Sequence, residues 1–200
     1  MSSHFAVRPD WFDTGLIAVA HDVRSMHNIG AIFRTADGAG FAGLVLSGIS
    51  GAPPDPRIAK VALGAERTVP HTIAPDLDAL LDLLDEVHVV LLEQAPGAVA
   101  ISELAVPSSS AVALVVCGEI TGAPRQLLSR ADQVAEIPMF GSKESLNVSV
   151  AFGIAAYQLG VQRRSPQDGL QAVRGPHPVR DGVLTHGVTQ GQTPSRKDRD

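Results

Sequence analysis

Short apolar runs alternate with longer stretches of helical periodicity along most of the chain. Five runs predict strands, and most of them are apolar throughout, as expected for strands buried on both faces: 15–20, 43–47, 87–92, 111–117 and 133–137. Four stretches between or after them predict helices: 29–39, 76–84, 124–130 and 147–159. Such alternation is typical of a parallel sheet covered by helices on both faces, so the pattern predicts an α/β fold.

The predicted elements fit one domain. We expect residues 15–162 to form it, preceded by an extension over 1–14. From about Arg163 the chain becomes rich in Gly, Pro, Gln and charged residues, which predicts a flexible tail over 163–200. The alternative for this tail is a basic arm that contacts RNA phosphates.

The composition points to a reducing compartment. The start of the chain lacks the apolar stretch of a secretory signal, and no run approaches the ~18 apolar residues of a spanning helix. The single cysteine cannot form an internal disulfide or, alone, a cysteine-based metal site. We therefore expect a cytoplasmic protein with no membrane partner and no metal.

The charge balance is acidic but uneven. Lys plus Arg number 16 and Asp plus Glu 21, which argues against a large basic groove for nucleic acid. Seven of the acidic residues lie in 76–103, which holds no basic residue. The rest of 1–162 carries 9 basic and 10 acidic residues, so a local basic surface remains possible.

Two residue patterns resemble known functional motifs but lack the surrounding elements that those motifs require. Gly38, Gly40 and Gly43 have the spacing of a dinucleotide fingerprint, but they follow a predicted helix and precede a strand. They are better interpreted as a helix C-cap and turn. His21, Asp22 and Ser25 could suggest a hydrolase triad, yet no nucleophile elbow surrounds them.

The segment 27–37 carries the first candidate site. Asn28 is a residue type that caps helices, which predicts that the helix opens there. Arg34 lies among apolar neighbours, so we expect its stem to be packed and its guanidinium to reach an anion or hydroxyl. The alternative is a surface arginine that pairs with Asp37.

Two later segments also carry candidate chemistry. The strand 111–117 runs into Gly118 and Glu119, where glycine permits close approach to a ligand. Glu119 could cap the next turn or hold the arginine. The segment 137–151 is long and apolar for a simple connection, although Ser145 or Asn147 could merely cap the last helix.

Together the three segments resemble the SpoU/TrmH family of RNA ribose 2′-O-methyltransferases in the SPOUT superfamily. Asn28 and Arg34 look like its first motif, and Glu119-x-x-Gly122 is similar to its second. The third motif is matched nearly letter for letter by Ile137-Pro138-Met139 followed by Ser145-Leu146-Asn147-Val148-Ser149-Val150-Ala151. Cys117 departs from the glycine that is usual at its position.

The resemblance implies a C-terminal trefoil knot, S-adenosyl-L-methionine as cofactor, and a homodimer with composite sites that acts on tRNA or rRNA. The residues at the family's cofactor-binding positions are Glu93, Cys117, Gly118, Ile137, Met139 and Leu146. The surplus of apolar residues in 147–159 agrees with a partner subunit.

The resemblance also implies catalytic roles. Arg34 would bind the RNA phosphate and the ribose hydroxyl, and Glu119 would orient Arg34. Asn28 and Ser145 would position ribose and phosphate, while Asn147 would hold the knot loop. The alternative function is a catalytically weak knotted RNA-binding or ribosome-assembly protein.

Overall fold

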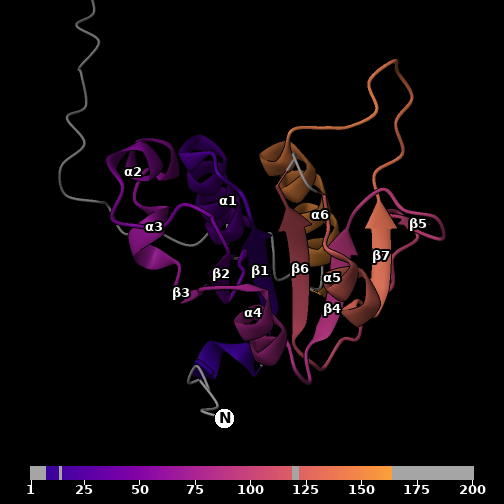
Figure 1. The fold of residues 1–200 in the computed structure, drawn as a ribbon, viewed down its shortest axis with the longest axis horizontal. Helices are drawn as coiled ribbons and strands as arrows, with labels where there is room; N and C mark the ends of the chain where they lie inside the picture. Colours follow the sequence, from indigo (N-terminus) through magenta and orange to yellow (C-terminus); the bar gives the residue numbers. More distant parts are fainter. Residues whose placement is uncertain (1–7, 14, 119–121, 164–200) are drawn as a thin grey trace, which may run out of the picture.

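The computed structural model describes residues 8–13, 15–118 and 122–163. Within them, seven parallel strands form one sheet in the order β3-β2-β1-β6-β4-β7-β5 (Figure 1). The strands are β1 Leu16–His21, β2 Gly43–Ser47, β3 His71–Ala74, β4 His88–Leu92, β5 Val99–Ala100, β6 Val112–Cys117 and β7 Gln133–Glu136. The predicted parallel sheet is confirmed.

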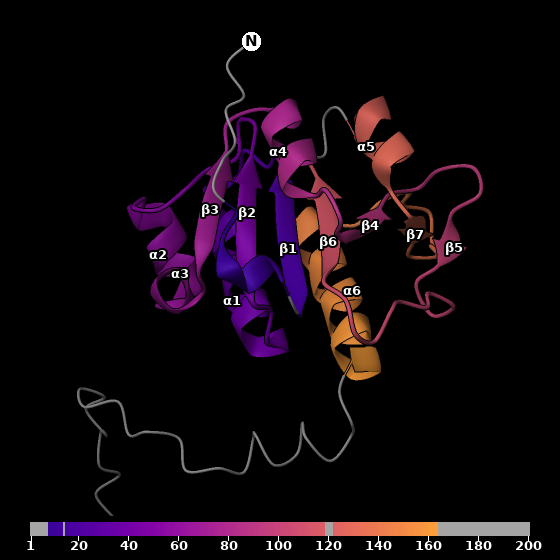
Figure 2. The ribbon, with the colours of Figure 1, turned by 90° about the horizontal axis from the view of Figure 1, so that it is seen from below.

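Helices cover both faces of this sheet. They are the 3-10 turn η1 Asp10–Phe12 and the helices α1 Met26–Ala39, α2 Pro56–Ala62, α3 Ala65–Thr68, α4 Leu77–Leu83, α5 Arg125–Arg130 and α6 Val148–Arg163. Figure 2 shows α1, α2, α3 and α6 on one face and α4 and α5 on the other. The chain therefore has the three layers expected from strands without a polar face.

The central strand β1 shows why the sheet is buried on both sides. Its alternate residues Leu16, Ala18 and Ala20 pack in the core beneath α1 and α6. Ile17 and Val19, between them, pack in the second core beneath α4 and α5. Successive side chains of a strand point to opposite faces, so an uninterrupted apolar run is needed to fill two cores.

Five short elements escaped the sequence pattern: η1, α2, α3, β3 and β5. The edge strand β3 is exposed at His71 and Ile73, so it lacks the apolar run that marks the central strands. β5 has only two residues. The threading of a knot remains a prediction, and the tail from 164 onward and residues 1–7 lie outside the described residues.

The start of α1 differs from the expectation. The cap is Ser25, whose hydroxyl accepts a hydrogen bond from the Asn28 backbone N–H at 3.3 Å, so Asn28 lies in the first turn. This frees the Asn28 side chain for another contact. The C-terminal end is as predicted, because Gly40 caps the helix with a φ of 67°.

Close packing fixes α1 between two other helices. A Cβ on Gly30 would lie 2.7 Å from the carbonyl oxygen of Ile58 in α2, so only glycine permits this approach. On the other side, Gly153 of α6 faces Thr35. Held in this way, α1 presents Arg34 on its exposed side.

Candidate functional site

A cavity of about 180 Å³ opens beyond the carboxyl ends of β4, β6 and β7. The loop that leads into α6, together with the first turns of that helix, closes it. Its lining residues are Leu92, Glu93, Gln94, Val116, Cys117, Gly118, Gly122, Glu136, Ile137, Met139, Ser145, Leu146, Val148 and Ala151. Ligands of open α/β sheets bind at this edge, so the cavity is the leading candidate site.

All six residues expected to bind a cofactor line this cavity: Glu93, Cys117, Gly118, Ile137, Met139 and Leu146. Ser145, expected to be catalytic, lines it as well. The sequence reasoning gave no site role to the seven other lining residues: Leu92, Gln94, Val116, Gly122, Glu136, Val148 and Ala151. Gly122, Val148 and Ala151 already stood in the matched motifs. The other four lie at or near strand ends, and this position was a usable signal.

Gly118 fits the cavity wall because it has no side chain. A Cβ there would lie 2.2 Å from the backbone oxygen of Asp22, which follows β1. The Gly118 N–H donates to the carbonyl oxygen of His21 at 2.9 Å. The end of β6 is thereby held against the end of β1, and its backbone forms part of the wall.

Cys117 lies beside Gly118 with its thiol held in the protonated form. Burial, together with the negative charges of Glu93 and Asp22, raises the pKa of Cys117 to about 12. A thiolate is the reactive form of cysteine, so this side chain is an inert, apolar part of the cavity at neutral pH.

We predict slow alkylation of Cys117 in the folded chain. With a pKa of about 12, roughly one thiol in 10⁴ is ionised at pH 8, against about a quarter in an unfolded chain with a pKa of ~8.5. Iodoacetamide should therefore modify the native protein at least ~100-fold more slowly than the urea-unfolded protein. Mass spectrometry can follow this directly because the sequence holds one cysteine. Equal rates of alkylation in the native and the unfolded protein would contradict a protonated Cys117 thiol.

Asn28 and Asn147 meet next to the cavity. The Asn147 amide Nδ2 donates to Asn28 Oδ1 at 3.2 Å. Asn147 Oδ1 accepts from the Ser149 backbone N–H at 3.0 Å and from the Ser149 hydroxyl at 2.7 Å. Asn147 thus caps α6 and also joins it to α1, across 119 positions of sequence.

Arg34 does not line the cavity of its own chain. The residue is exposed, while its apolar neighbours Ile32, Phe33 and Ala36 are fully buried. The expected packing of its stem stays a prediction. It does not pair with Asp37, which accepts from the Thr68 hydroxyl at 3.1 Å. Among residues 8–13, 15–118 and 122–163, no hydrogen bond or ion pair involves the Arg34 guanidinium. Glu119 lies outside the described residues.

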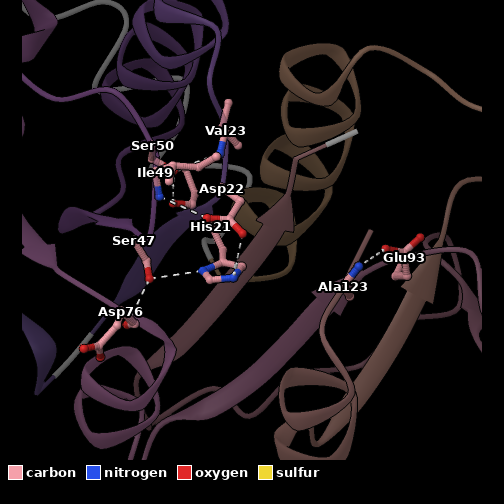
Figure 3. Close-up of polar contacts among 10 residues, drawn as sticks. His21, Asp22, Val23, Ser47, Ile49, Ser50, Asp76, Glu93 and Ala123 are labelled. Carbon is pink, nitrogen blue, oxygen red and sulfur yellow. Dashed lines mark hydrogen bonds and ion pairs between the residues drawn. The ribbon is translucent and has the colours of Figure 1, made fainter. Parts of the chain in front are cut away.

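The suspected hydrolase triad does not assemble. Ser25 caps α1, and the hydroxyl next to the ring of His21 belongs instead to the fully buried Ser47, whose Oγ lies 3.1 Å from Nδ1 (Figure 3). Asp22 lies 3.4 Å from Nε2. Burial lowers the pKa of His21, while the Asp22 carboxylate partly opposes this shift. Ser47 has no access to solvent and therefore cannot meet a substrate as a nucleophile, so His21 and Ser47 serve the core.

The described residues hold neither a metal-binding cluster nor a membrane-spanning helix. The described part of the chain contains no group of three or more His, Cys, Asp or Glu side chains that could hold a metal ion. None of its helices combines the length and the apolar composition needed to cross a bilayer.

Known proteins match most of this chain in sequence. Two relatives are named 23S rRNA (guanosine-2′-O-)-methyltransferase RlmB. The protein of Coxiella burnetii is 32% identical over 151 residues, which cover 76% of this chain and 60% of the relative. That of Haemophilus influenzae is 34% identical over 148 residues, covering 74% and 60%. The chain thus spans about three fifths of the length of these relatives.

Solved structures agree with these matches. An AdoMet-bound rRNA methyltransferase from Sinorhizobium meliloti is 28% identical with a TM-score of 0.71, covering 76% of this chain and 58% of the other. The TrmH/SpoU tRNA modifying enzyme of A. aeolicus is 27% identical with a TM-score of 0.65, covering 80% and 85%. The model of the SpoU rRNA Methylase family matches residues 15–157. The chain therefore belongs to the SpoU rRNA Methylase family.

Proposed function

We propose that this chain is an S-adenosyl-L-methionine-dependent methyltransferase that methylates a ribose 2′-hydroxyl in ribosomal or transfer RNA. The observation that carries the proposal is the convergence of the six expected cofactor residues and Ser145 on one cavity. The names of the matched relatives, which include rRNA and tRNA enzymes, support the same reaction class. We expect the enzyme to act in the cytoplasm, where these RNAs are found.

The cavity suits the proposed cofactor. Ile137, Met139 and Leu146 offer apolar surface for an adenine ring, and Gly118 brings backbone into the wall because it has no side chain. The lining residues include two carboxylates, Glu93 and Glu136, and no Lys or Arg. This charge favours a ligand that carries a positive group. When bound, S-adenosyl-L-methionine would supply an electrophilic methyl group.

The acceptor hydroxyl needs alignment and the loss of a proton. Holding the reacting groups in line can account for ~7–11 kcal/mol of the barrier. A guanidinium stays protonated and is a poor base, so Arg34 would act by binding the RNA phosphate and stabilising the developing alkoxide. The cavity residues would hold the cofactor so that it could supply its methyl group to the ribose oxygen. The hydroxyl proton would pass to the substrate phosphate or to water.

The remaining site residues would serve the acceptor. Asn28 and Asn147 are bonded to each other, so Asn147 would hold the loop before α6 while Asn28 presents its amide to the ribose. Ser145, in the cavity wall, would bind the ribose or phosphate. We assign Glu119 to the orientation of Arg34, as its place in the second motif implies.

We further propose a homodimer that is built on α6. The helix buries one face in its own core and exposes four apolar residues, Val150, Ile154, Tyr157 and Val161, by 41–73%. Their spacing places them along one stripe of the helix. A second copy would cover this stripe. Because α1 packs beside α6, the same contact would bring Arg34 of one subunit toward the cavity of the other.

Methylation mapping tests the proposed function. Total RNA from cells with and without the gene should differ at one or a few ribose 2′-O-methyl positions, and the purified protein should restore them with S-adenosyl-L-methionine. Calorimetry with the cofactor gives a second readout. Binding of RNA and cofactor without any restored methylation would favour the alternative, a catalytically weak RNA-binding or ribosome-assembly protein.

A further inference from the structure

Glu93 is bonded to backbone on both of its carboxylate oxygens. It follows β4, and its own N–H donates to Ala135 of β7 at 2.9 Å. Its Oε2 accepts the backbone N–H of Ala123 at 2.9 Å (Figure 3), and Oε1 accepts that of Gln94 at 3.0 Å. Hydrogen bonds to an ionised acceptor are among the stronger ones in proteins. The carboxylate therefore links the end of β4 to a segment 30 positions away.

The linked segment is part of the cavity wall. Gly122 lines the cavity and has a φ of +61°, a conformation that favours glycine. A Cβ at Gly122 would lie 3.4 Å from Glu93 Oε2, in ordinary contact. Pro124 then caps α5 without a side-chain hydrogen bond. Among the described residues, the hydrogen bond from the Ala123 N–H to Glu93 is thus a side-chain contact that holds this wall just before α5 begins.

We propose that Glu93 is a positioning residue, whose carboxylate holds the Gly122–Ala123 wall in the shape that binds the cofactor. This inference rests on the proposed function and changes the role of Glu93, which the family resemblance implied to be a direct cofactor contact. The competing role is electrostatic: Glu93 and Glu136 would attract a cationic cofactor by charge alone. The two roles require different properties of the side chain.

Two substitutions separate these roles. In Glu93→Gln the amide oxygen can still accept the Ala123 N–H, but the charge and the second acceptor, which takes the Gln94 N–H, are lost. In Glu93→Ala both the charge and the acceptor are lost. Glu103→Ala is the matched control, because Glu103 is an exposed acidic residue that does not line the cavity.

The first measurement is amide hydrogen exchange at Ala123 by NMR in the full chain without cofactor. Glu93→Ala should speed exchange of this amide about tenfold or more, whereas Glu93→Gln should stay within about threefold of wild type. The second is the Kd for S-adenosyl-L-methionine by calorimetry, which should weaken about tenfold in Glu93→Ala and no more than about threefold in Glu93→Gln. Glu103→Ala should change neither, and melting temperatures check that every variant is folded.

Rescue by glutamine is the decisive result. If Glu93→Gln loses as much affinity as Glu93→Ala while its Ala123 amide stays protected, charge is the cause and the positioning role is wrong. Unchanged exchange at Ala123 in Glu93→Ala would overturn the proposal as well. If wild type binds no S-adenosyl-L-methionine, the proposed function fails, but the exchange ratio still decides whether Glu93 holds the wall.

Discussion

Replacing Arg34 with alanine should reduce methyl transfer to RNA by at least about 150-fold and leave the Kd for S-adenosyl-L-methionine within about threefold of wild type. Arg34 is exposed and does not line the cavity of its own chain, so its removal should not disturb the cofactor. The loss corresponds to ~3 kcal/mol, as expected for a charged contact to the transition state. Single-turnover rates with saturating cofactor, together with calorimetry, give the two quantities.

Two further variants sharpen this test. Arg34→Lys keeps the charge but loses the planar fork of donors, so it should recover only part of the rate. Arg67→Ala removes an arginine whose side chain is 81% exposed on α3 and should behave as wild type. If Arg34→Ala retained more than about a tenth of the rate, the assignment of Arg34 to the acceptor would be wrong.

Charged residues in the exposed stripe of α6 should abolish both dimerisation and activity. The double variant Ile154→Asp/Tyr157→Asp places two carboxylates at residues that are 41% and 73% exposed in one chain, so a folded monomer tolerates them. A dimer interface built on this stripe cannot, because two unpaired charges would be buried. Sedimentation at micromolar concentration should show a monomer, and methyl transfer should fall to background. Leu63→Asp, at an equally exposed apolar residue off this helix, should remain an active dimer.

Dimers of two different variants test whether each active site combines residues of both subunits. Arg34→Ala and Ser145→Ala proteins, each inactive alone, should regain about a quarter of wild-type activity after unfolding and refolding together, because half of the dimers are mixed and one of their two sites is intact. An active monomer would rule out the composite site. Absence of recovery in a verified mixed dimer would place both residues in one chain's site.

The sequence predicted the elements that bury most apolar surface and missed those that bury little. The central strands β1, β2 and β6 must fill two cores, so their apolar runs were unmistakable. The helix α2 was missed although Asp55 and Pro56 form a recognisable start, with Asp55 capping and Pro56 in the first turn. Its seven residues are too few to show a helical periodicity of apolar positions.

In the candidate site, the positions of the family motifs predicted which residues line the cavity. Reasoning from neighbouring residues alone was less accurate. The residues expected to bind a cofactor came together although Glu93 and Leu146 are far apart in sequence, because parallel strands end at one edge of the sheet. Ser25, rather than Asn28, caps α1, and both are residue types that cap helices well, so composition alone could not choose between them. The threading of a knot leaves no periodic trace in a sequence.

The strand order places the first part of the chain on one side of the sheet and the residues that line the cavity in the later part. β3, β2 and β1 come from the first 74 residues and form one side of the sheet, whereas every lining residue of the cavity lies at or after Leu92. The first part meets the cavity wall through the backbone oxygen of Asp22 against Gly118, an atom that any residue would supply. Under the proposed function, exposed side chains of the first part can therefore change with the RNA target without altering the cofactor cavity, whereas Asn28 and Arg34, which serve the acceptor, must stay.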